Sequence, residues 1–411
     1  MFDHVVADIQ ANWFLYLSIP ITGSVVGYAT NILALKMMFL PLDFTGWRPL
    51  LGWQGIVPRK AGKMASITVD TLVPRLVTER QIYDRLDPQR VAQEIEAPML
   101  ELISHMTEDI LAEFEPRIWE TLPRALQQRI IRRIQEDAPK AVAELMAELR
   151  NDIENVFDLK DMVITTLVRD KRLMNRIFQE TGREEFRFIA KSGLYFGAVF
   201  GVLQMLGWLF YQAPWQLPIF GLLVGYLTNA IALRLIFQPQ TPLEVGPWRV
   251  QGLFHKRQKE VSRDYGRLIA DEVVTPGNII EAVLKGPCSD RVFMMIARHV
   301  KQVIDAQSGI ARPLVVWTLG SRRYTQMKDA AVARLVAKLP ETIHSVDSYA
   351  KEAMDLANTL SSQLATLPPA EFEAMLRPAF QEDEWMLIAA GAVLGTSVGI
   401  GQLILFGMFT G

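Results

Sequence analysis

The chain has 411 residues, half of them hydrophobic, with a mean hydropathy of +0.15 and a formal net charge of -2. Soluble proteins of this length usually carry less apolar sequence, and a near-neutral chain has no general attraction to nucleic acid. Cys288 is the only cysteine, which excludes an intrachain disulfide. The sequence contains no histidine pair at helical metal-ligand spacing, no phosphate-binding loop and no nucleophile elbow. We therefore expect a protein that is not an enzyme, with no catalytic, metal-binding or cofactor-binding residues.

Four apolar stretches are long enough to cross a bilayer, which takes about 20 residues. They lie at about 13–39, 193–211, 215–237 and 385–409. The first lacks a basic leader and is too long for a signal-peptide core, so we do not expect it to be cleaved. Polar blocks at about 41–192 and 238–384 separate the spans. Their apolar residues recur every three or four positions, which predicts amphipathic helices. Asp87-Pro88 predicts one helix start, and further prolines predict several helices in place of one rod.

The first and third spans carry nearly the same fourteen residues, VGYATNILALKMMF at 26–39 and VGYLTNAIALRLIF at 224–237. The second and fourth spans share three glycines and a glutamine, again 198 positions apart. These are Gly193, Gly197, Gly201 and Gln204 in one span and Gly391, Gly395, Gly399 and Gln402 in the other. The chain therefore reads as a fused duplication, with repeat one at 1–212 and repeat two at 213–411. Both copies cross the membrane in the same direction, which predicts a pseudo-two-fold axis along the membrane normal.

Lysine and arginine mark the cytoplasmic ends of membrane spans. Basic residues follow the first and third spans, whereas residues 1–12, the link 211–216 and the tail 408–411 contain none. Both termini are therefore expected outside and both polar blocks inside. We predict an all-α integral membrane protein with four transmembrane helices in two tandem parallel repeats and a helical cytoplasmic body.

The motifs GYxTNxxAxxxxF, QG followed by basic residues, and GxxxGxxxGxxQ run through nearly the whole chain. Through these motifs, the sequence resembles the YheB/YjiN-like family of bacterial membrane proteins, which is catalogued as domain of unknown function 445. The first half departs from the second at 177–197, where it reads IFQETGREEFRFIAKSGLYFG. The resemblance implies a multi-pass protein of the bacterial cytoplasmic (inner) membrane with a helical body, and it brings no established reaction.

Polar side chains interrupt the apolar spans, and two hypotheses account for them. They hydrogen-bond a neighbouring helix, at about 1 kcal/mol or less per bond, or they form a polar site for a solute or ion. Because no Asp or Glu lies mid-span, we favour the first hypothesis. We expect Gln204 to face Gln402, and Asn31 to face Asn229, across the pseudo-axis. The residues are Thr30, Asn31 and Gln204 in repeat one and Thr228, Asn229 and Gln402 in repeat two.

Glycines spaced by four lie on one helix face and allow a neighbouring helix to approach closely. By symmetry the second and fourth spans are each other's natural partner, with the first and third spans as the alternative. The loops after the first and third spans combine tryptophan with basic residues, which suits the headgroup level. The residues expected to contact headgroups are Trp47, Arg48, Arg59, Lys60, Lys63, Trp248, Arg249, Lys256, Arg257 and Lys259.

Two functions remain open at the level of sequence. The first is a non-enzymatic, membrane-anchored helical scaffold whose partners are membrane lipid, a protein or a second copy of the chain, and not nucleic acid. The second is a channel or carrier for lipid or a small solute along a polar axis between the repeats. The scaffold requires a dry, glycine-packed bundle, whereas the carrier requires a wet cavity between the intramembrane polar residues.

Overall fold

The computed structural model describes residues 2–47, 51–211, 213–308, 320–343, 346–374 and 384–410. These residues are helical apart from two short β-hairpins, so the all-α prediction is confirmed. They form two compact units. The first unit comprises Met1–Leu72, Leu167–Tyr265 and Ser361–Gly411, and the second comprises Val73–Thr166 and Gly266–Leu360. Each unit takes segments from both halves of the sequence, and the division into repeats at 1–212 and 213–411 stays a prediction.

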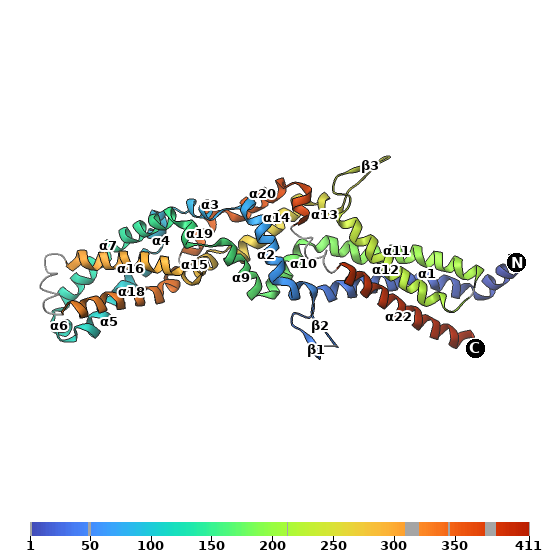
Figure 1. Cartoon of the computed structure of the whole chain (residues 1–411), viewed down its shortest axis with the longest axis horizontal. Coiled ribbons are helices and arrows are strands. Elements are labelled where there is room, and N and C mark those ends of the chain that lie inside the picture. The colour runs from blue at the N-terminus through green and yellow to red at the C-terminus, as the bar shows by residue number, and fades with distance from the viewer. Residues whose placement is uncertain are drawn as a thin grey trace. The chain divides into compact units, whose positions relative to one another are not determined.

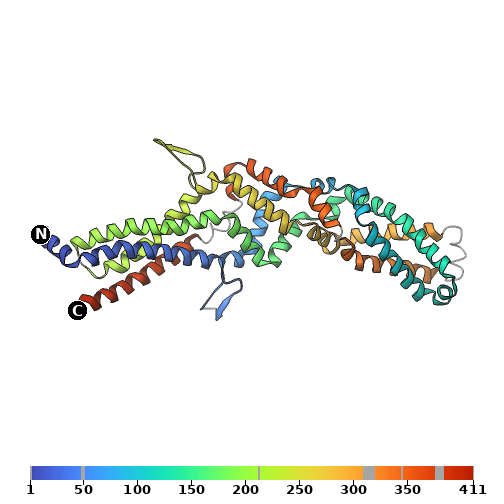
Figure 2. The same ribbon diagram turned by 180° about the vertical axis from the view of Figure 1, so that it is seen from behind.

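Four long helices dominate the first unit, namely α1 (Phe2–Phe39), α11 (Arg183–Phe210), α12 (Gln216–Phe237) and α22 (Glu384–Thr410). Each is long and apolar enough to cross a membrane, as the sequence predicts. Helix α11 begins at Arg183, ten residues before the predicted start of the second span. Figures 1 and 2 show the four helices running alongside one another, with both termini at the same end of this group. Helix α1 packs mainly on α11, and α12 packs mainly on α22.

The four helices bury a small centre and leave an apolar exterior. Tyr16 and Ile19 in the middle of α1 form a buried cluster with Trp208 near the end of α11 and Leu217 near the start of α12. Large apolar side chains lie exposed on the outer faces, among them Phe14, Val25, Tyr195, Val199, Tyr226, Trp385 and Val393. An apolar exterior around hydrogen-bonded helices is what a bilayer requires, because lipid satisfies no backbone group.

The two hairpins follow α1 and α12 at equivalent positions of the two sequence halves. Strands β1 (Thr45–Trp47) and β2 (Leu51–Trp53) pair antiparallel, as do β3 (Leu243–Val245) and β4 (Trp248–Val250). A cis peptide bond precedes each hairpin, at Leu40-Pro41 and at Gln238-Pro239. The sequence analysis missed these strands, because three residues are too few to show a period of two.

The remaining helices of the first unit are shorter. They are α2 (Ile56–Leu76), α9 (Leu159–Arg169), α10 (Lys171–Thr181), α13 (Leu253–Lys256), α14 (Gln258–Leu268) and α20 (Leu356–Thr366), of which α2, α9, α14 and α20 extend into the second unit.

The second unit contains four long helices that run alongside one another (Figure 1), namely α5 (Glu96–Phe114), α7 (Arg124–Asn151), α16 (Ser289–Ser308) and α18 (Ser321–Ile343). Shorter elements complete it: α3 (Glu79–Asp84), α4 (Pro88–Glu94), α6 (Pro116–Thr121), α8 (Ile153–Val156), the π-helix η1 (Ile269–Val273), α15 (Pro276–Lys285) and α19 (Asp347–Met354).

Proline and capping residues divide this unit as the sequence predicts. Asp87 accepts a hydrogen bond from the backbone nitrogen of Gln89 at 2.9 Å, which starts α4 at Pro88. Pro116 opens α6, and Pro123 caps α7. The prediction of several helices is therefore confirmed.

Candidate functional site

The glycines of α11 bring its backbone against that of α1. A methyl group added at Gly193 would collide with the carbonyl oxygen of Gly27. One added at Gly197 would collide with the carbonyl oxygen of Gly23. No residue larger than glycine fits this contact without moving a backbone. Such close approach gives the wide van der Waals contact that holds helices together in lipid.

Helix α22 meets α12 in the same manner. A methyl group at Gly391 would meet the carbonyl oxygen of Gly225 at 2.6 Å, and one at Gly395 would collide with the carbonyl oxygen of Gly221. The expectation that the second and fourth spans are each other's main partner is wrong. Each glycine face instead meets the span that opens its own half of the chain, which was the alternative.

The last glycine of each series meets a proline. An added methyl group would lie 2.6 Å from Cα of Pro20 at Gly201 and 2.7 Å from Cα of Pro218 at Gly399. All six glycines of the sequence prediction therefore lie in helix contacts.

Asn31 and Asn229 each hydrogen-bond a backbone carbonyl of the partner helix. Asn31 Nδ2 donates to the oxygen of Ile189 at 2.6 Å, and Asn229 Nδ2 donates to the oxygen of Leu387 at 3.0 Å. Both side chains are buried, and the two bonds span the same 158 residues of sequence. The asparagines therefore serve their own helix pairs, and the expectation that they face each other is wrong.

The other intramembrane polar residues differ between the two halves in hydrogen bonding and burial. Thr30 Oγ1 donates to the oxygen of Val26 in its own helix at 2.9 Å. Thr228 and Gln204 are buried, and Thr228 Oγ1 and Gln204 Nε2 have no hydrogen-bond partner among the described residues. Gln402 is only half-buried. The two glutamines thus differ in environment although they occupy matching positions in sequence.

The predicted headgroup residues lie on the hairpins and the helices that follow them. Trp47 in β1 is 85% exposed, and Arg48 lies outside the described residues. Trp248 and Arg249 lie in β4, where Arg249 pairs with Glu244 at 3.4 Å. Arg59, Lys60 and Lys63 lie on α2, Lys256 ends α13 and Lys259 lies on α14.

Arg257 has a partner within the protein. Its Nη1 donates to Oε1 of Glu185 at 2.8 Å, and its Nε donates to Oε2 of Glu260 at 2.9 Å. The side chain of Glu185 is only 4% exposed, so its buried negative charge is balanced by Arg257. The structure therefore gives Arg257 an internal role in place of a free position at a headgroup.

Residues on either side of the second hairpin along the chain join a polar cluster around the buried Glu373. Sequence analysis missed this cluster. His255 Nε2 lies 3.3 Å from Oε2 of Glu373, and Gln240 Nε2 donates to the same oxygen at 2.7 Å. The side chains of His255 and Glu373 are 1% and 2% exposed. In the first half, the position 198 residues before Glu373 is Asn175, which donates to the oxygen of Phe39 at 2.7 Å. Because 118 residues separate His255 from Glu373, no local motif signals the pair.

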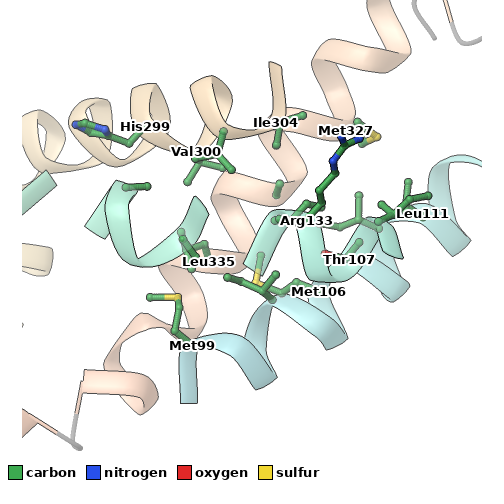
Figure 3. A pocket seen from close by; sticks show the side chains of 18 of the residues that line it. Met99, Met106, Thr107, Leu111, Arg133, His299, Val300, Ile304, Met327 and Leu335 are labelled. Carbon is green, nitrogen blue, oxygen red and sulfur yellow. The ribbon is translucent and has the colours of Figure 1, made fainter. Parts of the chain in front are cut away.

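The second unit also holds a cavity of about 430 Å³ between α5, α7, α16 and α18 (Figure 3). Its volume falls in the range of small-molecule sites, which are mostly apolar with a few polar groups. Sequence reasoning missed the cavity, because a periodic apolar stripe looks the same whether the space between helices is filled or empty.

Comparison with known proteins gives relatives in several bacteria, each called a UPF0754 membrane protein. The relative in Bacillus mycoides (strain KBAB4) is 23% identical over 128 residues, which cover 30% of this chain and 32% of the relative. In Exiguobacterium sibiricum the identity is 25% over 142 residues, or 34% of each chain. In Synechococcus elongatus it is 30% over 110 residues, covering 25% of this chain and 26% of the relative.

The chain therefore spans about a third or less of the length of these relatives. No family model and no solved structure matches it. With the four apolar helices, the likeness identifies a helical membrane protein, and the relatives' names state no activity. The narrower resemblance to the YheB/YjiN-like family stays a prediction.

Proposed function

We propose that the protein is a non-enzymatic scaffold of the bacterial cytoplasmic membrane, whose helical body binds membrane lipid or protein partners. The observation that carries this proposal is the pair of hydrogen bonds that Asn31 and Asn229 make between helices. Each donates its amide hydrogen bond to a backbone carbonyl inside a glycine-packed helix pair. A transport path needs polar groups that are left for the solute, whereas these groups hold two helices together.

The proposal includes an orientation with both termini outside and the helical body in the cytoplasm. Its support is the distribution of lysine and arginine. Lys36 and Arg234 lie in the last turns of α1 and α12, and further basic residues follow both helices. The link between α11 and α12 has no charge. Two parallel repeats, each spanning the membrane twice, are part of the same proposal.

A channel or carrier is the second candidate, and buried polar atoms favour it. Asn31 Oδ1, Gln204 Nε2 and Thr228 Oγ1 have no hydrogen-bond partner among the described residues. Buried polar groups of this kind usually bind something. The two candidates differ in whether water reaches these atoms.

Cysteine accessibility separates the two candidates. Asn31→Cys and Asn229→Cys are made in a Cys288→Ser background, and the purified chain in lipid nanodiscs is treated with a small hydrophilic thiol reagent. The scaffold predicts that neither cysteine reacts while Trp47→Cys, at an exposed position, reacts fully. Rapid reaction at both asparagine positions in folded protein would favour the channel or carrier.

A further inference from the structure

The cavity of the second unit is elongated and follows the four helices that line it. Along α5 the lining residues run from Met99 to Leu111, a distance of about 18 Å at 1.5 Å per helical residue. The walls are aliphatic and methionine side chains, including Met106, Ile134, Val142, Val300, Ile304 and Leu335. Methionine adapts its shape to flexible apolar ligands. The cavity therefore suits a long, thin apolar group.

Most polar groups at the cavity already have partners within the protein. Glu115 lies 3.8 Å from Arg323, His299 lies 2.9 Å from Glu148, and Tyr324 donates to Asp305 at 2.8 Å. These pairs satisfy Glu115, His299 and Tyr324, which line the cavity.

Arg133 differs from these groups. It lines the cavity from α7, and it has no ion-pair or hydrogen-bond partner among the described residues. Figure 3 shows its side chain extending toward Met327, away from the end that holds His299. Arginine remains charged at any physiological pH and binds a carboxylate through two parallel hydrogen bonds. One end of an apolar cavity thus offers an uncommitted cation.

We infer that this cavity binds a long-chain fatty acid, with the acyl chain between the four helices and the carboxylate at Arg133. A methylene group occupies about the liquid volume of one water molecule, roughly 30 Å³. The 430 Å³ of the cavity is therefore enough for one chain of about fourteen carbons. The inference deepens the proposed function, since it names a lipid that the helical body binds.

The inference is tested on the full chain in phosphatidylcholine nanodiscs with a photoreactive fatty acid of about fourteen carbons. Crosslinks are located by mass spectrometry, and affinity is measured by competition with unlabelled fatty acid. We expect crosslinks on α5, α7, α16 and α18, at one fatty acid per chain. Shortening the competitor by two methylenes should weaken binding about tenfold, because each buried methylene contributes to affinity.

Variants at Arg133 test the polar end. Arg133→Ala should weaken binding of the carboxylate about fivefold and leave binding of the methyl ester unchanged, because an exposed ion pair contributes modestly. Arg132→Ala is the matched control, since Arg132 is an exposed neighbour outside the cavity lining. Equal effects of the two substitutions, or an equal loss for acid and ester, would overturn the assignment of Arg133.

Cavity-filling variants test the apolar part. Ala138→Phe on α7 and Ala331→Phe on α18 place a ring in the cavity, and each folded variant should lose the crosslinks. Unchanged crosslinking in a folded variant, no binding by the wild type, or binding of a diacyl lipid in preference to the fatty acid would each overturn the inference. Thiol accessibility at Asn31 is independent of these measurements, so failure of the scaffold proposal and failure of this inference are distinguishable.

Discussion

At the scale of single residues, the amide groups of Asn31 and Asn229 show how one polar side chain works in an apolar helix pair. Each donates to a backbone oxygen that is itself near a glycine contact. In lipid such a bond contributes about 1 kcal/mol, since the separated helices can find other partners. The bond therefore adds a modest stabilisation to a helix pair that the glycine contacts already bring together.

Replacing either asparagine by alanine should lower the free energy of unfolding by about 1 kcal/mol, measured by denaturant titration in detergent. Ser397→Ala is the control, because Ser397 is exposed and donates only to the oxygen of Val393 in its own helix. A double Asn→Ala protein of unchanged stability would remove the proposed role in helix association.

The buried cluster of His255, Glu373 and Gln240 gives a second prediction at this scale. Glu373→Ala leaves the buried His255 and the half-buried Gln240 without their acceptor, and we expect a loss of about 2–3 kcal/mol in the free energy of unfolding. Glu373→Gln retains an acceptor oxygen and should cost less. Both are measured by chemical denaturation, and an equal loss for the two variants would show that the acceptor is not what matters.

At the scale of elements, the glycine contacts fix which helices pair. Gly197→Leu and Gly395→Leu should each force a helix pair apart and cost roughly 2 kcal/mol or more, as overpacking does. Val199→Leu and Val393→Leu are matched controls on exposed faces of the same helices. Thermal unfolding in detergent measures the difference. Glycine variants that are as stable as the valine variants would contradict the packing.

The sequence predicts the helices better than it predicts their neighbours. Length and apolar content are enough to find the four spans, and glycine spacing finds the contact face of α11. The partner of that face depends on three-dimensional arrangement, and symmetry alone favoured the wrong one for α11 and α22. The hairpins were not predicted, because strands of three residues are too short to show a period of two. The pair of His255 and Glu373 was not predicted, because its members are far apart along the chain.

At the scale of the whole molecule, the proposed orientation puts the exposed lysines after α12 at the cytoplasmic surface. Near an anionic surface each basic residue contributes about 1 kcal/mol, and added salt screens this attraction. Replacing both Lys256 and Lys259 by glutamine should therefore reduce the stabilisation of the protein by anionic lipid over neutral lipid. Lys140→Gln in the second unit is the control. A salt-independent effect, or an equal effect of the control, would contradict the headgroup contact.

The central claim is a membrane scaffold whose helical body faces the cytoplasm, and labelling in intact cells tests it most directly. A single cysteine is placed at Ala11 in α1 or at Glu108, which is exposed on α5, in a Cys288→Ser background. An impermeant thiol reagent is added before and after the membrane is opened. The account predicts labelling at Ala11 in intact cells and at Glu108 only after opening. Labelling at Glu108 but not at Ala11 in intact cells would contradict it.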